Sequence, residues 1–276
     1  MGQLVYACIA PHGFEIVPEV AGPELQHFAP VREGMEQLGL EMAAAKPDVI
    51  VIATPHGYRV EGHVSITTNE HAEGRLRKFG GEALFEVDCH QGFARDLLKN
   101  TKAAGIPALE TVYGSASGSF SILPLDWGCF IPLWFMGARW ETPPKIVVVT
   151  PTREIGLDSL IQFGEVLANT VAASDQRVAF IASADEGHAH DAEGPYGYHP
   201  AAKEYDELVC DAVQRNALSE LMNLDMKFVD DAKPDSLWQI AMLVGVQKHV
   251  SLESRLVAYQ VPTYYGMMCA SLTPKA

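Results

Sequence analysis

The chain has 276 residues, 48% hydrophobic and 20% charged, which is enough to bury a sizeable core and is typical of globular proteins, not disordered ones. Its formal net charge of −15 argues against nucleic acid or an anionic membrane surface as a partner, because like charges repel. Five scattered cysteines without a CxxC pair argue against a disulfide framework or a zinc ribbon.

The apolar segments carry no targeting signal. No basic region precedes the short apolar run near the N-terminus, and no uninterrupted apolar stretch reaches about 18 residues. We therefore expect a cytoplasmic protein with reduced thiols, neither secreted nor inserted into a membrane.

The tripeptide Pro-His-Gly ends two runs of strand-forming residues. The first run covers 4–10 and leads to His12, and the second covers 49–54 and leads to His56. Proline donates no N–H to a ladder and glycine turns the chain without a Cβ clash, so each histidine should follow a buried strand. A predicted helix over 31–45 makes the two strands parallel. We expect them to be neighbours, with both imidazoles in the crevice at their carboxyl ends as two-thirds of a metal site.

The rest of the chain predicts alternating helices and strands beneath long loops. Residues 58–81 predict a polar loop or irregular ribbon, and the Gly- and Ser-rich residues 108–124 predict a flexible wall of the active site. We expect helices over 91–104, 129–140, 157–170, 201–221 and 236–246, strands over 145–150 and 177–183, and an edge strand or antiparallel hairpin over 255–271. The fold class is α/β: one domain over 1–276, with a mostly parallel central sheet flanked by helices and the site formed by loops at the strand carboxyl ends.

A histidine-rich loop after a later strand holds His188, His190 and His199. Loops that follow parallel strands share one rim of the sheet, so we expect this loop near His12 and His56. Neutral imidazole suits Fe(II) and Zn(II), and a mononuclear iron site that activates O2 typically has two histidines and one carboxylate. Surface or structural roles are expected for His27, His63, His71, His90 and His249.

A carboxylate ligand must come from elsewhere in the chain. Asp230, Asp231 and Asp235 lie just before a predicted amphipathic helix. Asp235 or Ser236 is a suitable N-cap, and a helix N-terminus stabilises a carboxylate. Capping alone would explain Asp235, so the residues by themselves leave capping and metal ligation open.

Several short motifs follow one another through most of the chain. They are Pro11-His12-Gly13, Pro47-Asp48 with His56-Gly57, Leu125-Asp126-x-Gly128 with Pro132-Leu133, Ile181-Ala182-Ser183-x-Asp185-x-x-His188, and Ala232-x-x-x-Asp235 with Gly245. Their order and spacing resemble the class III extradiol ring-cleavage dioxygenases, which include the protocatechuate 4,5-dioxygenase β subunit, aminophenol and DOPA dioxygenases and Memo-type proteins. The resemblance implies a non-haem Fe(II) enzyme that opens a catechol- or aminophenol-type ring with O2, with Zn(II) or Mn(II) as other possible metals.

The resemblance also implies roles for individual residues. His12, His56 and Asp235 would be the metal ligands, and His188 the catalytic acid/base. Family members usually carry Glu where this chain has Asp235, so the shorter side chain requires its helix to sit closer to the metal. Asp231, one turn earlier, is the fallback ligand.

Substrate contacts are expected from Trp127, His190 and Tyr198. Trp127 stands where the family carries an active-site histidine, and since an indole N–H only donates, we expect this side chain to stack on an aromatic substrate. His190, Tyr196 and Tyr198 are candidates for substrate contacts or for a surface turn.

Two other functions stay open. One is a Zn(II)-dependent hydrolase built on the same two-histidine, one-carboxylate set. The other is a Memo-like accessory protein without ring cleavage, which the Trp127 and Asp235 departures favour. No nucleotide-binding glycine motif occurs, so no nicotinamide or flavin is expected. The expected partners are a small aromatic substrate and O2, with the chain forming a homo-oligomer or a complex with a small subunit.

Overall fold

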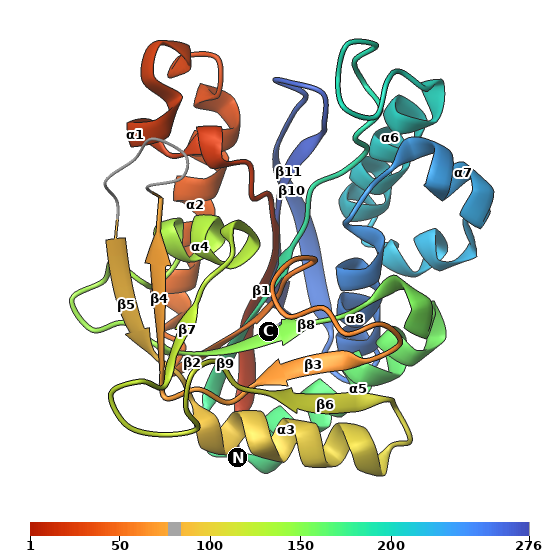
Figure 1. Ribbon diagram of the computed structural model, residues 1–276. Coiled ribbons are helices and arrows are strands. Elements are labelled where there is room, and N and C mark those ends of the chain that lie inside the picture. The colour runs from red at the N-terminus through yellow and green to blue at the C-terminus, as the bar shows by residue number, and fades with distance from the viewer. Residues whose placement is uncertain (77–83, 276) are drawn as a thin grey trace.

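An eight-stranded sheet forms the centre of the computed structural model, which describes residues 1–76 and 84–275 (Figure 1). The strand order is β10-β11-β1-β9-β2-β8-β3-β6, and the four central strands β1, β9, β2 and β8 are parallel. These eight strands are β1 (Gln3–Ala10), β2 (Val49–Ala53), β3 (Val64–Thr67), β6 (Ala108–Thr111), β8 (Lys145–Thr150), β9 (Arg177–Ser183), β10 (Leu252–Gln260) and β11 (Met267–Pro274). A smaller sheet, ordered β5-β4-β7, contains β4 (His71–Arg75), β5 (Leu84–Asp88) and β7 (Ile122–Pro124).

Helices cover both faces of the large sheet. One face packs on α3, α5, α6 and α8, and the other packs on α2, α4 and the smaller sheet. The helices are α1 (Pro18–Ala21), α2 (Ala29–Ala45), α3 (Gln91–Ala103), α4 (Trp127–Phe135), α5 (Leu157–Ala173), α6 (Pro200–Gln214), α7 (Met226–Ala232) and α8 (Leu237–Gln247). The predicted α/β domain with a mostly parallel sheet is therefore confirmed.

The alternation of side chains along the central strands builds two hydrophobic cores. In β2, Val51 belongs to the core beneath α5 and α8, whereas Ile50 and Ile52 belong to the core beneath α2 and α4. Every residue of this strand is buried, as expected for a parallel strand covered on both faces. The apolar run that ends at the second Pro-His-Gly is thus explained by burial on two sides.

The strands that carry the two Pro-His-Gly turns are not neighbours, so that prediction was wrong. β9 lies between β1 and β2 and pairs in parallel with both. Strand order depends on contacts between distant segments, which the strand–helix–strand pattern does not specify. The consequence is that Ser183 and the loop after it lie between His12 and His56.

Two segments predicted as loops contain short strands. Residues 58–81 include β3 and β4, while 77–81 lie outside the described residues, and residues 108–124 include β6 and β7. These strands have three to five residues each, too few for a clear period, and they are held by distant partners. β3, for example, pairs antiparallel with β8 and parallel with β6.

In the C-terminal third, helices and a hairpin occur where they are predicted, but the residues at which they begin and end differ. The predicted helix over 201–221 ends at Gln214, because Asn216 adopts a left-handed conformation (φ 56°) and the chain turns into a short 3-10 segment and α7. β10 and β11 form an antiparallel hairpin, as the alternating pattern indicates. Among the described residues, no helix combines the length and apolarity needed to cross a membrane.

Candidate metal centre

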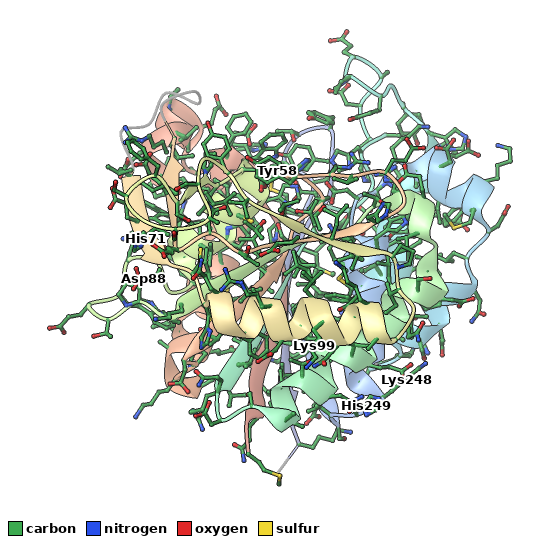
Figure 2. All side chains as sticks on the ribbon, turned by 60° about the horizontal axis from the view of Figure 1, so that its bottom comes forward. Tyr58, His71, Asp88, Lys99, Lys248 and His249 are labelled. Atoms are coloured by element: carbon green, nitrogen blue, oxygen red, sulfur yellow. The ribbon has the colours of Figure 1, made fainter. Side chains whose placement is uncertain are left out.

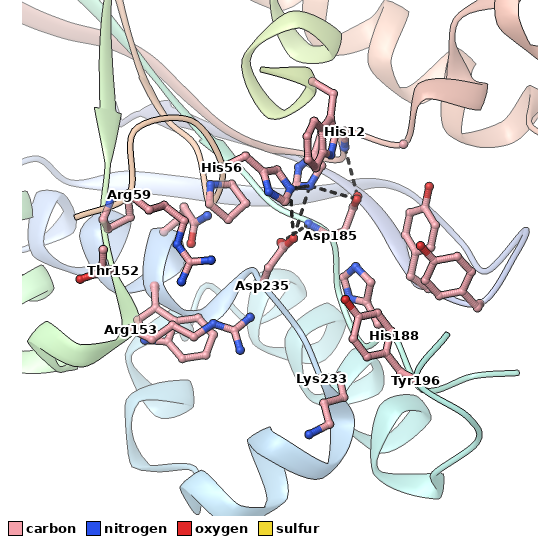
Figure 3. Close-up of a pocket in the computed structure, with 18 of the residues that line it drawn as sticks. His12, His56, Arg59, Thr152, Arg153, Asp185, His188, Tyr196, Lys233 and Asp235 are labelled. Atoms are coloured by element: carbon pink, nitrogen blue, oxygen red, sulfur yellow. Dashed lines mark hydrogen bonds and ion pairs between the residues drawn. The ribbon is translucent and has the colours of Figure 1, made fainter. Parts of the chain in front are cut away.

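Side chains from three strand ends and one helix N-terminus meet at the carboxyl rim of the central strands. His12 follows β1, His56 follows β2, Asp185 and His188 follow β9, and Asp235 precedes α8. All five line one cavity of about 390 Å³ (Figure 3). The convergence predicted for the two histidine turns and the later histidine-rich loop is present.

His12 is the most enclosed of these groups, with 2% of its surface exposed. Its Nε2 lies 3.2 Å from Nε2 of His56, 3.3 Å from Oδ2 of Asp235 and 3.2 Å from Oδ2 of Asp185. Its Nδ1 lies 3.0 Å from Oγ of Ser183, whose hydroxyl donates to the carbonyl of Gly128 at 2.5 Å. Because that hydroxyl proton is used, Nδ1–H donates to Ser183 and Nε2 faces the cavity, the arrangement a metal-bound histidine requires.

His56 is held through its backbone and by an aromatic neighbour. Its N–H donates to Oγ1 of Thr54 at 3.2 Å, and that hydroxyl donates to buried Asp126 at 2.9 Å. Asp126 also caps α4 by accepting the N–H of Cys129. The indole of Trp127 lies against the imidazole of His56, with ring centroids 4.0 Å apart. The ring is therefore positioned by one face contact while its Nε2 points to His12.

Asp235 faces the cavity and does not cap α8. Its Oδ1 accepts the N–H of Asp185 at 2.8 Å, and its Oδ2 lies 3.3 Å from Nε2 of His12 and 3.9 Å from Nε2 of His56. Ser236, the other suggested cap, donates its hydroxyl to Glu186 instead. Neither side chain forms a capping hydrogen bond to the helix, so capping does not explain Asp235.

Asp185 is a member of the cluster that the residue patterns alone did not single out. One of its oxygens accepts the N–H of His12 at 3.1 Å, and the other lies 3.2 Å from Nε2 of the same residue. Asp185, His188 and Asp235 form a second group whose ligand atoms lie close enough to share a metal ion. The available signal was its place two residues after β9, at the rim where the histidine turns lie.

The fallback ligand Asp231 is not part of the centre. It pairs with Lys227 at 2.7 Å along α7 and does not line the cavity. An ion pair between residues four apart on a helix stabilises that helix, which accounts for Asp231 without metal ligation.

His188 stands at the edge of the cluster among tyrosines. Its ring stacks on Tyr265 with centroids 5.2 Å apart, and Tyr196 and Tyr264 contact it at 5.7 and 6.0 Å. Its backbone N–H donates to the carbonyl of Ala232, while its Nδ1 is buried without a hydrogen-bond partner among the described residues. His188 thus lies beside the candidate ligands and in contact with the cavity.

The histidines and carboxylates of the cluster have pKa values shifted in opposite directions. Burial lowers the pKa of His12, but the carboxylates of Asp185 and Asp235 outweigh burial and raise it to about 9. Burial and the charge of His12 together lower the pKa of His56 to about 3. Burial raises the pKa of Asp185 to about 6, whereas His12 outweighs burial at Asp235 and lowers its pKa to about 2. In the metal-free protein, His12 is therefore an imidazolium paired with Asp235, and His56 is neutral.

The donor set of His12, His56 and Asp235 fits a divalent transition metal. Two imidazole nitrogens and a carboxylate oxygen suit Fe(II) or Zn(II). Ligand atoms about 2.0–2.2 Å from one ion lie roughly 2.8–3.6 Å from each other, from right-angle to tetrahedral geometry. The separations here are 3.2, 3.3 and 3.9 Å, and only the last needs a small side-chain rotation.

Two predicted substrate contacts lie away from the cavity. His190 lines no part of it, because its Nε2 bonds buried Asp206 at 2.8 Å, and that carboxylate also accepts the hydroxyl of Tyr259. Tyr198 is 62% exposed and is also absent from the lining, whereas Tyr196 belongs to it. Trp127 lines the cavity as expected and is 40% exposed. The choice between the two tyrosines depends on the turn at 194–197, which sequence spacing does not specify.

The other histidines have structural partners. His71 pairs with Asp88 at 2.9 Å, and Lys248 and His249 both pair with Glu165. Figure 2 shows His71, Asp88, Lys248 and His249 on the exterior. The remaining partners are the carbonyl of Pro262 for His27, the carbonyl of Glu61 for His63, the N–H of Phe93 for His90 and the N–H of Ala201 for His199. Surface or structural roles were expected for all of these except His199, which was expected near the site but caps α6 and does not line the cavity.

Comparison with known proteins gives a family match over most of the chain. Residues 6–268 match the LigB model, described as the catalytic LigB subunit of aromatic ring-opening dioxygenase. The 2-aminophenol 1,6-dioxygenase beta subunit of a Pseudomonas species is 24% identical over 258 residues, covering 84% of this chain and 81% of that protein.

One further relative and one solved structure are similar to the chain over most of its length. Protein CA_C1420 of Clostridium acetobutylicum is 23% identical over 263 residues, covering 94% of this chain but 56% of that longer protein. The crystal structure of uncharacterized protein JW3007 from Escherichia coli K12 superposes with a TM-score of 0.59 at 14% identity, covering 98% of this chain and 99% of that one. This last likeness supports the fold.

Proposed function

Because the chain belongs to the LigB family of aromatic ring-opening dioxygenase subunits, we propose that it is a non-haem Fe(II) extradiol dioxygenase acting on a catechol- or aminophenol-type ring. The observation that carries the proposal is the convergence of His12, His56 and Asp235 on one point of a cavity large enough for a small aromatic molecule. The name of the Pseudomonas relative supports the substrate class.

In this proposal the three ligands hold the metal on one side of the cavity. When bound there, an Fe(II) ion would supply Lewis acidity and a place for O2 to bind. Ser183 keeps the Nδ1 proton on His12 and so keeps Nε2 directed at the metal. The N–H of Asp185 fixes one oxygen of Asp235 and leaves the other for the metal.

His188 is the proposed acid/base. It lies next to Asp185 and Asp235, close enough to receive a proton from a substrate hydroxyl held beside the metal. Tyr265 stacks on its imidazole and keeps the ring in place. Trp127 and Tyr196 both contribute aromatic rings to the cavity lining, which suits the packing of an aromatic substrate.

Ring cleavage is tested by anaerobic loading with Fe(II), followed by O2 and a panel of substituted catechols and 2-aminophenol. We expect O2 uptake with the appearance of an absorbing ring-opened product. His188→Gln should keep the bound iron and slow turnover by about 10²–10⁴-fold. No O2 uptake across the panel, with iron confirmed in the protein, would refute the proposal.

A metal-binding protein without ring cleavage is the second candidate. The observation that favours it is Trp127, whose indole covers a face of His56 where the family carries a histidine. This candidate requires tight metal binding together with no O2 uptake. A zinc hydrolase would be separated from both by metal content and by hydrolytic turnover without O2.

The Pseudomonas relative is named a beta subunit, which supports assembly of this chain with itself or with another subunit. Light scattering of the purified protein at several concentrations gives its mass in solution. A mass equal to a single 30.1 kDa chain at every concentration would refute self-assembly.

A further inference from the structure

A second cavity lies beside the metal centre, between the small sheet and the large one. Its volume is about 210 Å³. Strands β3 and β8 of the large sheet, β7 of the small sheet and two connecting turns supply its lining, which consists of Gly57, Tyr58, Thr67, Leu123, Pro124, Asp126 and Val148. The larger cavity is lined by their chain neighbours His56 and Trp127 but by none of these residues. The two cavities are therefore adjacent and have separate walls.

The floor of the second cavity is buried and largely apolar, and its mouth is open. Leu123 and Val148 are each 4% exposed and form the floor, whereas Gly57 and Pro124 are exposed and Tyr58 is partly buried. A dry protein cavity of about 150 Å³ is large enough to hold a benzene molecule. The space here therefore suits one aromatic or aliphatic ring with a short substituent.

One carboxylate faces this cavity with one of its two oxygens unused. Oδ1 of Asp126 accepts the hydroxyl of Thr54 at 2.9 Å and the N–H of Cys129 at 3.1 Å. Oδ2 accepts no N–H or O–H from the part of the chain that the structure describes. A Cβ on Gly57 would lie 2.9 Å from Oδ2, so the absence of a side chain there leaves this oxygen open. Because Gly57 also lines the cavity, Oδ2 is the oxygen that a ligand would meet.

No cation compensates the charge of Asp126 at close range. Within residues 1–76 and 84–275 it forms no ion pair at 4.0 Å or less. Burial raises the pKa of its carboxyl, and the bonds from Thr54 and Cys129, together with the more distant charge of His12, oppose that rise. A positively charged group beside Oδ2 would therefore stabilise the ionised carboxylate.

The chemistry of the lining selects among classes of ligand. Asp126 repels an anion, and a neutral apolar molecule would displace water from Oδ2 without offering it a donor, which costs free energy. A cation gains from the carboxylate and also from the ring of Tyr58, since an aromatic face attracts an ammonium group. The ligand that satisfies the lining has one ammonium group and a small apolar body.

We propose that this cavity binds a small primary amine in its ammonium form, with the ammonium group on Oδ2 of Asp126 and the apolar body against Leu123 and Val148. A charge-assisted N–H···O bond is roughly twice as strong as one between neutral groups. The hydroxyl of Thr67, which shares a hydrogen bond with that of Thr111 at 3.1 Å, offers a further polar contact. This site lies outside the metal centre and goes beyond the proposed ring cleavage.

The test compares two ligands of nearly the same shape, of which only one is charged. Protein loaded with Zn(II) is titrated by calorimetry with benzylamine and with benzyl alcohol at about pH 7, where the amine is protonated. We expect benzylamine to bind at least about tenfold more tightly. The preference should persist in protein freed of metal with EDTA, because no residue that lines the second cavity is a proposed metal ligand.

Substitutions assign the preference to the second cavity. Asp126→Asn keeps an acceptor for Thr54 and for the N-terminus of α4 but removes the charge, and it should lower the ratio of the two dissociation constants about tenfold. Asp225→Asn is the matched control, since Asp225 caps α7 in the same way but lies outside the lining, and it should keep the wild-type ratio. Val148→Ile adds one methylene to the floor and should weaken benzylamine binding several-fold.

Equal dissociation constants for the two ligands would overturn the inference. So would a preference that survives in Asp126→Asn, which means binding elsewhere on the protein, or one that is lost in EDTA, which means coordination of the amine to zinc. If Asp126→Asn does not fold, Val148→Ile decides, and wild-type affinity for benzylamine in that variant overturns the site. The O2-uptake assay is separate, so ring cleavage and amine binding can each fail without the other.

Discussion

The two Pro-His-Gly turns have the same sequence and the same position after a parallel strand, yet their histidines have different surroundings. The His12 side chain is 2% exposed, lies between two carboxylates and bonds Ser183. The His56 side chain is 25% exposed and lies against Trp127, and within residues 1–76 and 84–275 its imidazole forms a hydrogen bond only with His12. Neighbouring strands, not the local tripeptide, therefore determine how each imidazole ionises and how firmly it is held.

The largest expected effect is a difference in stability between the two alanine variants. Both His12→Ala and His56→Ala should lose metal binding, measured as metal content after Zn(II) loading and desalting. In the metal-free protein, only His12→Ala should also lose about 3–5 kcal/mol of unfolding free energy, because it leaves Asp185 and Asp235 buried without their cationic partner. Urea unfolding in EDTA measures this, and equal losses in both variants would contradict the comparison.

A pH titration should separate the same two residues. The pKa of His12 is raised to about 9 from an ordinary value of 6.5, so its contribution to stability is complete below pH 6.5 and disappears as pH rises through 9. The pKa of His56 is lowered to about 3, so it is neutral throughout that range. Urea midpoints of the metal-free protein should fall from pH 6.5 to 9, corresponding to a few kcal/mol. This fall should be smaller in His12→Gln than in His56→Gln, and parallel curves for the two variants would refute the assignment.

A smaller effect is expected from the residues that support each turn. Ser183→Ala removes the partner of His12 Nδ1 and should weaken Zn(II) binding by about 10–100-fold. Thr54→Ser keeps the hydroxyl that contacts the backbone of His56 and serves as the control. Competition with a chromophoric chelator measures both affinities. Wild-type affinity in Ser183→Ala would mean that this bond does not orient His12.

The smallest effect concerns the aromatic contact on the more exposed histidine. Trp127→Ala should weaken Zn(II) binding by about 2–10-fold, since an aromatic pair contributes roughly 0.5–1.5 kcal/mol. Trp127→Phe should retain most of the affinity because it keeps a ring against His56. The same chelator competition applies, and a loss as large as that in Ser183→Ala would show that Trp127 does more than stack.

The sequence by itself determined the features that depend on neighbouring residues. β9 spans the predicted residues 177–183, and β8 spans the predicted 145–150, because β-branched runs bounded by turn residues are local signals. The placement of His12 and His56 at strand ends follows from proline and glycine in the same way. The nomination of Asp235 came from the family resemblance. Its side chain lies beside both histidines, and its role as a metal ligand stays a prediction.

Only the tertiary structure decided which side chains share the cavity. The insertion of β9 between β1 and β2 brings Ser183 to the Nδ1 of His12, and it places Asp185 in the cluster. The turn after His188 directs His190 to Asp206, although it is only two residues away in sequence. Arg59 and Arg153, which no sequence motif marks, line the same cavity because β2 and β8 are paired neighbours. Strand order and side-chain direction depend on contacts between segments tens of residues apart, and a local pattern contains no record of them.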